Sequence, residues 1–160
     1  VYKRQELYLA GDHVCQGFYK DEDKFIDSCE NGFYKTGDLV RVDEDGFFYV
    51  VGRKKDMYIS GGENVYPGEV EKSLLEIPGI EAAIVVPVQD EKWGEVGMAY
   101  LNTHSDRLEL SDVKEGLSTK ISNYKQPHYI KYLDEFPLLA NGKIDRVRLK
   151  EKAKYESRNI

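Results

Sequence analysis

The sequence predicts an α+β fold, in which a small mixed sheet with packed helices is preceded by a segment built mainly of strands. Three observations lead to this prediction. Residues 6–54 alternate short apolar runs with turn signals, which is typical of β structure. From residue 55 onward, helical and strand patterns follow one another. Between the two parts lies a run of four charges at 53–56, which a buried strand would not tolerate unpaired.

The first part is expected to contain a hairpin, two further strands and a helical turn. Apolar runs at 39–42 and 47–51 flank an acidic segment that ends in glycine, which favours a hairpin. Asn31-Gly32 signals another turn. Segment 20–28 is polar, and Phe25 and Ile26 are the expected apolar anchors of a helical turn there. The further strands are expected at 6–10 and 14–19.

The second part shows apolar residues at helical spacing after Pro67, a residue that is tolerated in the first turn of a helix. Ser111 and Asp145 are expected to be the N-caps of two more helices. Segment 80–88 is apolar with little alternation, so we expect a strand buried on both faces. The expected helices are 67–77, 111–121 and 145–155, and the expected strands are 80–88, 96–103 and 129–136.

The composition excludes several classes of function. The chain has 160 residues and a net charge of −6, which argues against a nucleic-acid-binding face. No apolar run has the length of a membrane span and no signal peptide is visible, so we expect a cytoplasmic protein. Cys15 and Cys29 are expected to be reduced, half-buried thiols, and no metal site is expected.

Residues 1–5 fit their surroundings poorly, and we expect them to be a sequence artefact rather than part of the fold. In that case the chain would be the C-terminal portion of a larger protein.

The segment 52–71 combines a strand end, the charged run, a glycine bend and a helix start. Its Ile-Ser-Gly-Gly-Glu-Asn-Val-Tyr-Pro resembles the adenylate-forming enzymes, and the acyl-CoA and aryl-CoA ligases in particular. Tyr-x-Thr-Gly-Asp before it and Pro-x-x-x-x-Gly-Lys after it extend the resemblance to about residues 6–152. The resemblance implies that 6–54 end the large AMP-binding domain, and that 55–160 form its C-terminal lid domain.

The resemblance also implies a nucleotide site and a hinge. Asp38 matches the residue that holds the ribose hydroxyls. A carboxylate can accept one hydrogen bond from each of these two hydroxyls. Arg53 matches an arginine that contacts the nucleotide, and Lys55 matches the hinge position. From the residues alone, Asp38 is better explained as a residue that terminates a turn, and Arg53 can also be explained as an exposed side chain in a charged joint.

A second face is implied for CoA. Ser60, Gly61 and Gly62 would let the pantetheine arm pass along bare backbone, with Glu63 as a polar neighbour. The same glycines also fit a simple hairpin turn or bulge. Three further residues resemble the rim of the CoA nucleotide site, namely Trp93, Tyr124 and Lys125. Trp93 fits a stacking surface for adenine and a core plug about equally well.

Lys143 is the candidate catalytic residue. It follows Asn141-Gly142, a tight turn that would project its ammonium outward. In the resembling family this lysine bridges the attacking carboxylate and the α-phosphate, where negative charge develops. A bare Gly-Lys pair would otherwise be an ordinary solvated lysine. The segment is not a P-loop, because Pro137 and Ile144 stand where that motif needs Gly and Ser or Thr.

The implied function is the activation of a carboxylic acid, fatty or aryl, with ATP and Mg²⁺ to an acyl-adenylate, followed by transfer to CoA. Most of the ATP and Mg²⁺ contacts would lie on the missing N-terminal domain, so the chain alone is expected to be inactive. Two alternatives stay open. One is an adenylation domain that loads a carrier protein, and the other is an α+β binding module without catalysis.

Overall fold

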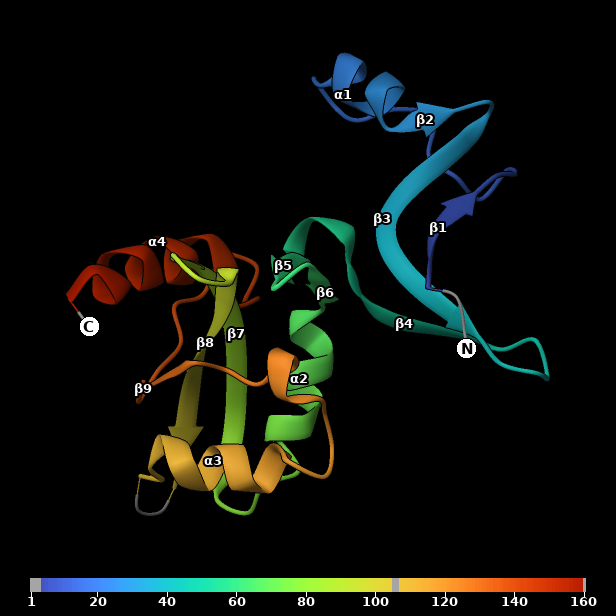
Figure 1. Ribbon diagram of the computed structural model, residues 1–160. Helices are drawn as coiled ribbons and strands as arrows, with labels where there is room; N and C mark the ends of the chain where they lie inside the picture. The colour runs from blue at the N-terminus through green and yellow to red at the C-terminus, as the bar shows by residue number, and fades with distance from the viewer. Residues whose placement is uncertain (1–3, 105–106, 160) are drawn as a thin grey trace. The chain divides into compact units, whose positions relative to one another are not determined.

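The computed structural model describes residues 4–104 and 107–159. It divides the chain between Lys55 and Asp56 into two compact units (Figure 1). The division falls inside the predicted charged joint, and within the 3-10 turn η1 (Lys54–Asp56). The assignment of these units to a large domain and a lid stays a prediction. No helix in the described residues is long and apolar enough to cross a membrane.

The first unit is organised around one long strand, β3 (Phe33–Val42). Three strands pair with it in antiparallel fashion, namely β1 (Gln5–Leu9), β2 (Cys29–Glu30) and β4 (Phe48–Arg53). The predicted turn at Asn31-Gly32 is confirmed, since both residues have positive φ angles of 50° and 82°. The predicted hairpin formed by β3 and β4 is confirmed as well. Residues 1–3 lie outside the described residues, and Gln5 pairs with Val40.

One predicted strand and one predicted helix anchor are wrong in this unit. Residues 14–19 form bends rather than a strand, because the apolar side chain of Phe18 is used in a ring cluster instead of a sheet face. Phe18 packs edge-on against Phe25 at 5.4 Å, and Phe25 stacks on Tyr34 at 6.0 Å. Helix α1 (Glu22–Asp27) therefore uses Phe25 as its anchor. Ile26 is exposed, since a helix of six residues presents only one face to the unit.

The two thiols are free, as expected, but only Cys29 is partly buried, whereas Cys15 is exposed. Cys15 belongs to the bent segment 14–19, which has no sheet to cover it. Half-burial was therefore the wrong expectation for Cys15.

The second unit is a five-stranded mixed sheet, which confirms the predicted fold class. Its strand order is β6 (Glu63–Val65), β5 (Tyr58–Ser60), β8 (Gly94–Thr103) and β7 (Ile80–Asp90). Strand β9 (Tyr129–Tyr132) pairs with β8 and runs parallel to it, whereas the other pairs are antiparallel. β9 is shorter than predicted, because the chain leaves the sheet after Leu133 donates to the carbonyl of Leu101.

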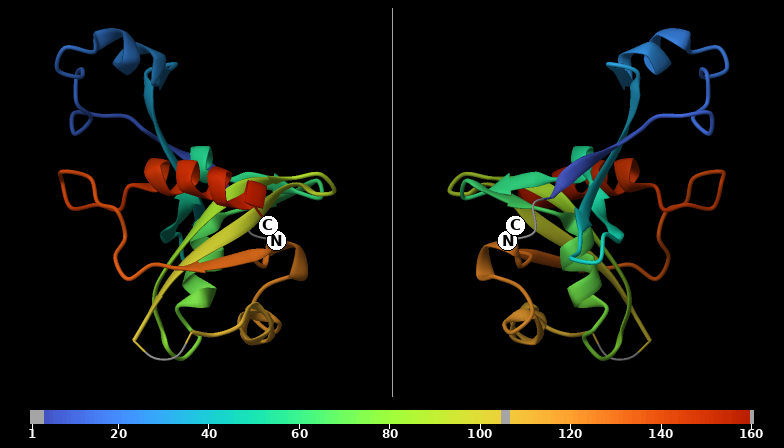
Figure 2. Two further views of the ribbon diagram at one scale, coloured as in Figure 1. Left: turned by 90° about the vertical axis from the view of Figure 1, so that its left-hand side faces the viewer. Right: turned by 90° about the vertical axis from the view of Figure 1, so that its right-hand side faces the viewer.

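Both faces of this sheet are covered, which confirms the prediction for 80–88. Ala83 and Val85 of β7 pack into one cluster with α2 (Pro67–Leu74) and α3 (Leu110–Leu117). Ile84 and Val86 point the other way, into a cluster with α4 (Arg146–Glu156). Figures 1 and 2 show α2 and α4 on opposite sides of β7 and β8.

Helix α3 starts earlier than predicted. Its N-cap is Glu109 and not Ser111, because Glu109 and Asp112 form a capping box in which each side chain accepts from the other residue's backbone N–H. Gly116 inside this helix has a packing reason. A Cβ there would lie 3.0 Å from Cδ1 of Ile77, so the glycine lets α3 approach the segment after α2. Asp145 caps α4 as predicted, with Oδ1 accepting from Arg148 N at 3.0 Å.

Candidate functional site

Asp38 and Arg53 are direct cross-strand partners at the end of the β3–β4 hairpin. Their side chains form an ion pair, with Arg53 Nε 2.6 Å from Asp38 Oδ1. Thr36 shapes the backbone before the carboxylate, because its hydroxyl donates to the carbonyl of Leu7 at 2.8 Å and accepts from Asp38 N at 3.0 Å. Gly37 between them has φ +72°, a conformation that other residues rarely adopt. The two predicted nucleotide residues are therefore held together.

A cavity of about 430 Å³ lies next to this pair, within the first unit. Thr36, Gly37 and Arg53 contribute to its wall. Lys54 also lines it, and its ammonium is 2.7 Å from Glu6 Oε2, a hydrogen bond that raises the pKa of Lys54. Lys55, the predicted hinge, is exposed and lines the same cavity. The opening is thus rich in cationic side chains.

The predicted glycine bend is a two-residue hairpin turn between β5 and β6. Ser60 and Glu63 are paired, and Gly61 and Gly62 have φ angles of +57° and +86°, which suits a type I′ turn. Ser60 is buried, whereas Gly61, Gly62 and Glu63 are exposed. The turn therefore presents backbone at the surface, and its role as a path for CoA stays a prediction.

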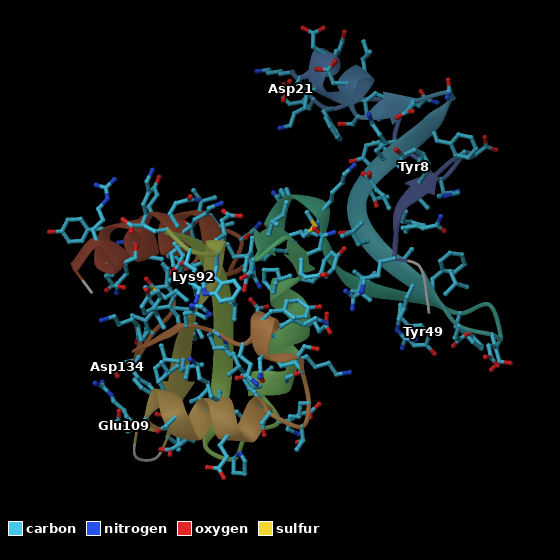
Figure 3. All side chains as sticks on the ribbon, in the orientation of Figure 1. Tyr8, Asp21, Tyr49, Lys92, Glu109 and Asp134 are labelled. Atoms are coloured by element: carbon cyan, nitrogen blue, oxygen red, sulfur yellow. The ribbon has the colours of Figure 1, made fainter. Side chains whose placement is uncertain are left out.

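Trp93 lies directly on this turn. Gly61 N donates to the carbonyl of Trp93 at 2.9 Å, and a Cβ on Gly61 would be 2.8 Å from the indole ring. Trp93 is 41% exposed, so it is not a core plug. Lys92, labelled in Figure 3, lies beside the indole, with Nζ 4.9 Å from the ring centroid. Asp90 fixes this corner by accepting from Trp93 N at 2.8 Å.

Tyr124 and Lys125 lie elsewhere, in the 3-10 turn η2 (Asn123–Lys125). Lys125 is directed to α2, where its ammonium is 2.6 Å from Glu69 Oε1. Its side chain is only 13% exposed, while the neighbouring Tyr124 is exposed. The sequence interpretation missed Glu69, although Glu69 sits in the same glutamate-rich helix start that carried the resemblance. Gln126 is buried and donates to Asn123 Oδ1 at 3.3 Å.

Lys143 closes a tight turn just before α4, as predicted. Gly142 has φ +78°, and Lys143 O accepts from Leu139 N at 2.7 Å. Lys143 N donates to Asn141 Oδ1 at 3.1 Å. The side chain is exposed, and within the described ranges its ammonium has no carboxylate partner. The turn thus offers a solvated, uncompensated cation.

Glu71 and Arg146, which the sequence motifs do not single out, form an ion pair between α2 and the start of α4. A second cavity, of about 540 Å³, lies between Phe136-Pro137 and α4, with Arg148 and Lys152 on its wall. Across the residues that the structure describes, no three His, Cys, Asp or Glu side chains gather to hold a metal ion.

Residues 69–143 match the family of the AMP-binding enzyme C-terminal domain. The chain is 38% identical over 143 residues to a feruloyl-CoA synthase from Amycolatopsis sp., covering 89% of this chain and 29% of that protein. It is 39% identical over 148 residues to the mitochondrial medium-chain acyl-CoA ligase ACSF2 of Mus musculus, covering 91% of this chain and 24% of that protein.

Two solved structures of o-succinylbenzoate CoA synthetase (MenE) from Bacillus subtilis have the same fold. The complex with its acyl-adenylate intermediate has a TM-score of 0.86 at 38% identity, over 93% of this chain and 31% of that one. The complex with ATP and magnesium ion has a TM-score of 0.84 at 36% identity, over the same two shares. The chain therefore spans less than a third of each of these relatives. In sequence and in fold it matches the C-terminal part of adenylate-forming acyl-CoA ligases.

Proposed function

We propose that the chain is the C-terminal part of an AMP-forming acid–thiol ligase that converts a carboxylic acid to its acyl-CoA. The observation that carries the proposal is Lys143, an exposed cation at the tip of a tight turn, in the position that the family's motif gives to its catalytic lysine. The curated relatives include ligases named for aryl and for medium-chain substrates, so we propose a fatty or aryl acid and not a narrower class.

In the first half-reaction, a carboxylate oxygen forms a bond to the α-phosphorus of ATP, and the bond to pyrophosphate breaks. Negative charge develops on the phosphate oxygens, and the Lys143 ammonium is proposed to stabilise it. Asp38 is proposed to accept hydrogen bonds from the ribose hydroxyls. Arg53, already bound to Asp38 at 2.6 Å, would orient that carboxylate and contact the nucleotide.

Magnesium is proposed as a cofactor of this step, since a neutralising metal suits phosphoryl chemistry. The described residues bring no metal-binding cluster together, so we assign its ligands to a preceding domain and none to this chain. The same domain is proposed to supply the remaining ATP contacts and the acyl pocket. On this proposal the 160-residue chain by itself does not catalyse either half-reaction.

In the second half-reaction, the CoA thiolate attacks the acyl carbonyl carbon and AMP leaves. The hairpin turn at Gly61-Gly62 is proposed to accept the pantetheine arm along its exposed backbone, flanked by Ser60 and Glu63. Trp93 lies on the turn and offers an aromatic surface for the adenine. Tyr124 and Lys125 are proposed as a more distant part of this rim, with Lys125 shared between CoA and Glu69.

The two proposed faces lie on different elements, so each half-reaction needs its own pose of the second unit. Lys55 is the proposed hinge, because it is exposed in the 3-10 turn η1 where the two units join. A solvated position of this kind can absorb large backbone changes without disturbing a core. We propose a cytoplasmic location, where ATP and CoA are both available.

The test uses the protein with its preceding domain and measures the two half-reactions separately. Lys143→Ala is expected to lower acid-dependent ATP–pyrophosphate exchange by roughly 100-fold or more, because the charge-stabilising cation is gone. Thioester formation from supplied acyl-adenylate should stay within about twofold of the parent, since that step uses the other face. Lys150→Ala, an exposed lysine on α4, is the matched control.

Two outcomes would favour the alternatives. Unchanged exchange in Lys143→Ala would support a binding module without catalysis. Transfer to a phosphopantetheinylated carrier protein in preference to CoA would support a carrier-loading enzyme.

A further inference from the structure

A partly buried ion pair joins two elements that are far apart in the sequence. Glu71 lies on α2 with a side chain that is 12% exposed, and Arg146 is the first residue of α4. One guanidinium nitrogen, Nη2, is 2.8 Å from Oε1 and 2.6 Å from Oε2 of Glu71. Charge-assisted hydrogen bonds such as these are roughly twice as strong as neutral ones.

Both members of the pair also bind the backbone of β7. Val85 N donates to Glu71 Oε1 at 2.8 Å, and Arg146 Nη1 donates to Val85 O at 3.4 Å. β7 is the outermost strand on this side of the sheet. The carboxylate and the guanidinium therefore take the place that the next strand would occupy, and they satisfy both polar groups of a buried residue.

The position of Arg146 is directly coupled to the Lys143 turn. Only Ile144 and Asp145 separate the two residues, and Ile144 forms a bridge with Leu138 across the turn. Asp145 N donates to the carbonyl of Pro137 at 2.8 Å, which closes the base of the same turn. A guanidinium anchored to α2 and β7 thus holds the chain at the point where the turn ends.

We propose that the Glu71–Arg146 pair positions the Lys143 turn, so that Arg146 is a positioning residue for the proposed adenylation step. This inference rests on the proposed function of Lys143 but can be tested without it. The competing explanation is that Leu149 and Ala153, both fully buried, fix α4 and the turn by packing alone. On that explanation the ion pair adds stability but does not restrain the turn.

The first experiment uses the 160-residue chain and measures amide hydrogen exchange. The reporters are the N–H groups of Leu139 and Gly142, which donate within the turn. Arg146→Met and Glu71→Gln should each accelerate exchange at these two sites by fivefold or more relative to buried amides of β8. The exchange rate in Arg146→Lys should lie between that of these two variants and that of the parent, since lysine keeps the charge and lacks the planar guanidinium.

The matched control is Val113→Ala, which removes buried methyl groups on α3, away from the turn. It should lower overall stability without selective acceleration at Leu139 and Gly142. The double variant Glu71→Gln with Arg146→Met should accelerate exchange by less than the product of the two single effects, because both remove the same contact. The proposal would be overturned if amide exchange at Leu139 and Gly142 were unchanged in Arg146→Met. It would also be overturned if the acceleration in the double variant equalled the product of the two single accelerations.

The second experiment uses the protein with its preceding domain. Arg146→Met is expected to lower kcat for ATP–pyrophosphate exchange by tenfold or more, with thioester formation from acyl-adenylate within about twofold. Arg146→Lys should recover part of the loss. If turn exchange accelerates but Lys143→Ala leaves adenylation intact, the proposed function fails and the positioning contact stands. If Lys143→Ala abolishes adenylation and Arg146→Met does not, the positioning role fails alone.

Discussion

The ammonium of Lys125 lies 2.6 Å from Glu69 Oε1, in an ion pair that joins η2 to the first turn of α2. The Lys125 side chain is 13% exposed, so this lysine is not a freely solvated phosphate ligand. Any CoA phosphate that it meets must share it with Glu69. The same lysine therefore has a structural contact that the motif did not indicate.

Lys125→Met should lower the free energy of unfolding by about 1–3 kcal/mol, because it removes the charge-assisted hydrogen bond between η2 and the partly buried Glu69 carboxylate. Urea denaturation of the chain measures this. Lys120→Met is the matched control, since it breaks the Lys120–Glu76 pair of 2.7 Å, whose side chains are more exposed. Its effect should stay below about 1 kcal/mol. Equal effects of the two variants would contradict the structural role of Lys125.

Gly61→Ala should be more destabilising than Gly62→Ala. Both glycines have positive φ, which costs an L-residue roughly 1–2 kcal/mol. At Gly61 the new methyl group would also meet the Trp93 ring at 2.8 Å, whereas at Gly62 it meets nothing within 4 Å. Thermal unfolding should give a lower Tm for Gly61→Ala, with a shift in tryptophan emission only in that variant. A lower Tm for Gly62→Ala than for Gly61→Ala would contradict the packing of Trp93 on the turn.

Tyr58→Phe should raise stability by about 1 kcal/mol. The hydroxyl of Tyr58 is buried, and among the described residues it has no hydrogen-bond partner, so its removal ends a desolvation cost. A Cβ on Gly97 would lie 2.6 Å from this hydroxyl oxygen. Gly97→Ala should therefore be less destabilising in the Tyr58→Phe background than in the parent. Equilibrium unfolding of the parent, the two single variants and the double variant completes the cycle, and additive effects would argue against this contact.

The pH dependence of stability should include a contribution from His128. Burial lowers the pKa of His128, with the nearby Lys114 acting in the same direction and Asp90 opposing it. The unfolded chain then binds more protons than the folded one between the lowered pKa and about 6.5. Stability should be full above that range and fall as the pH drops through it. His128→Gln should flatten this part of the profile in urea midpoints, and an unchanged slope would contradict the prediction.

Local chemistry made much of the fold predictable. Asn31, Gly32 and Gly142 have positive φ angles, Asp145 caps a helix with its own side chain, and the apolar run at 80–88 requires cover on both faces. The wrong predictions depend on tertiary contacts that cannot be inferred from local sequence. Residues 14–19 have a β-like composition, yet Phe18 is used in a ring cluster, and Ser111 is a good cap residue displaced by the reciprocal bonds of Glu109 and Asp112.

The same limit applies to the candidate site. The sequence indicated Asp38, Arg53 and Lys143 one by one, but not that Asp38 and Arg53 are bound to each other. Glu69 is 56 residues from Lys125 and Glu71 is 75 residues from Arg146, so neither partner could be inferred from spacing. Their pairing depends on how α2 packs against η2 and α4.

The contacts that Glu71 and Arg146 make with the edge of β7 have a consequence for how copies of the chain behave in concentrated solution. β7 is an apolar strand of 11 residues at the end of its sheet, and the unpaired backbone of such a strand is a template on which another chain can add. Glu71 and Arg146 occupy the middle of that edge with opposite charges. The pair therefore also disfavours the addition of a strand from another chain at this edge, and the aggregation that would follow from it.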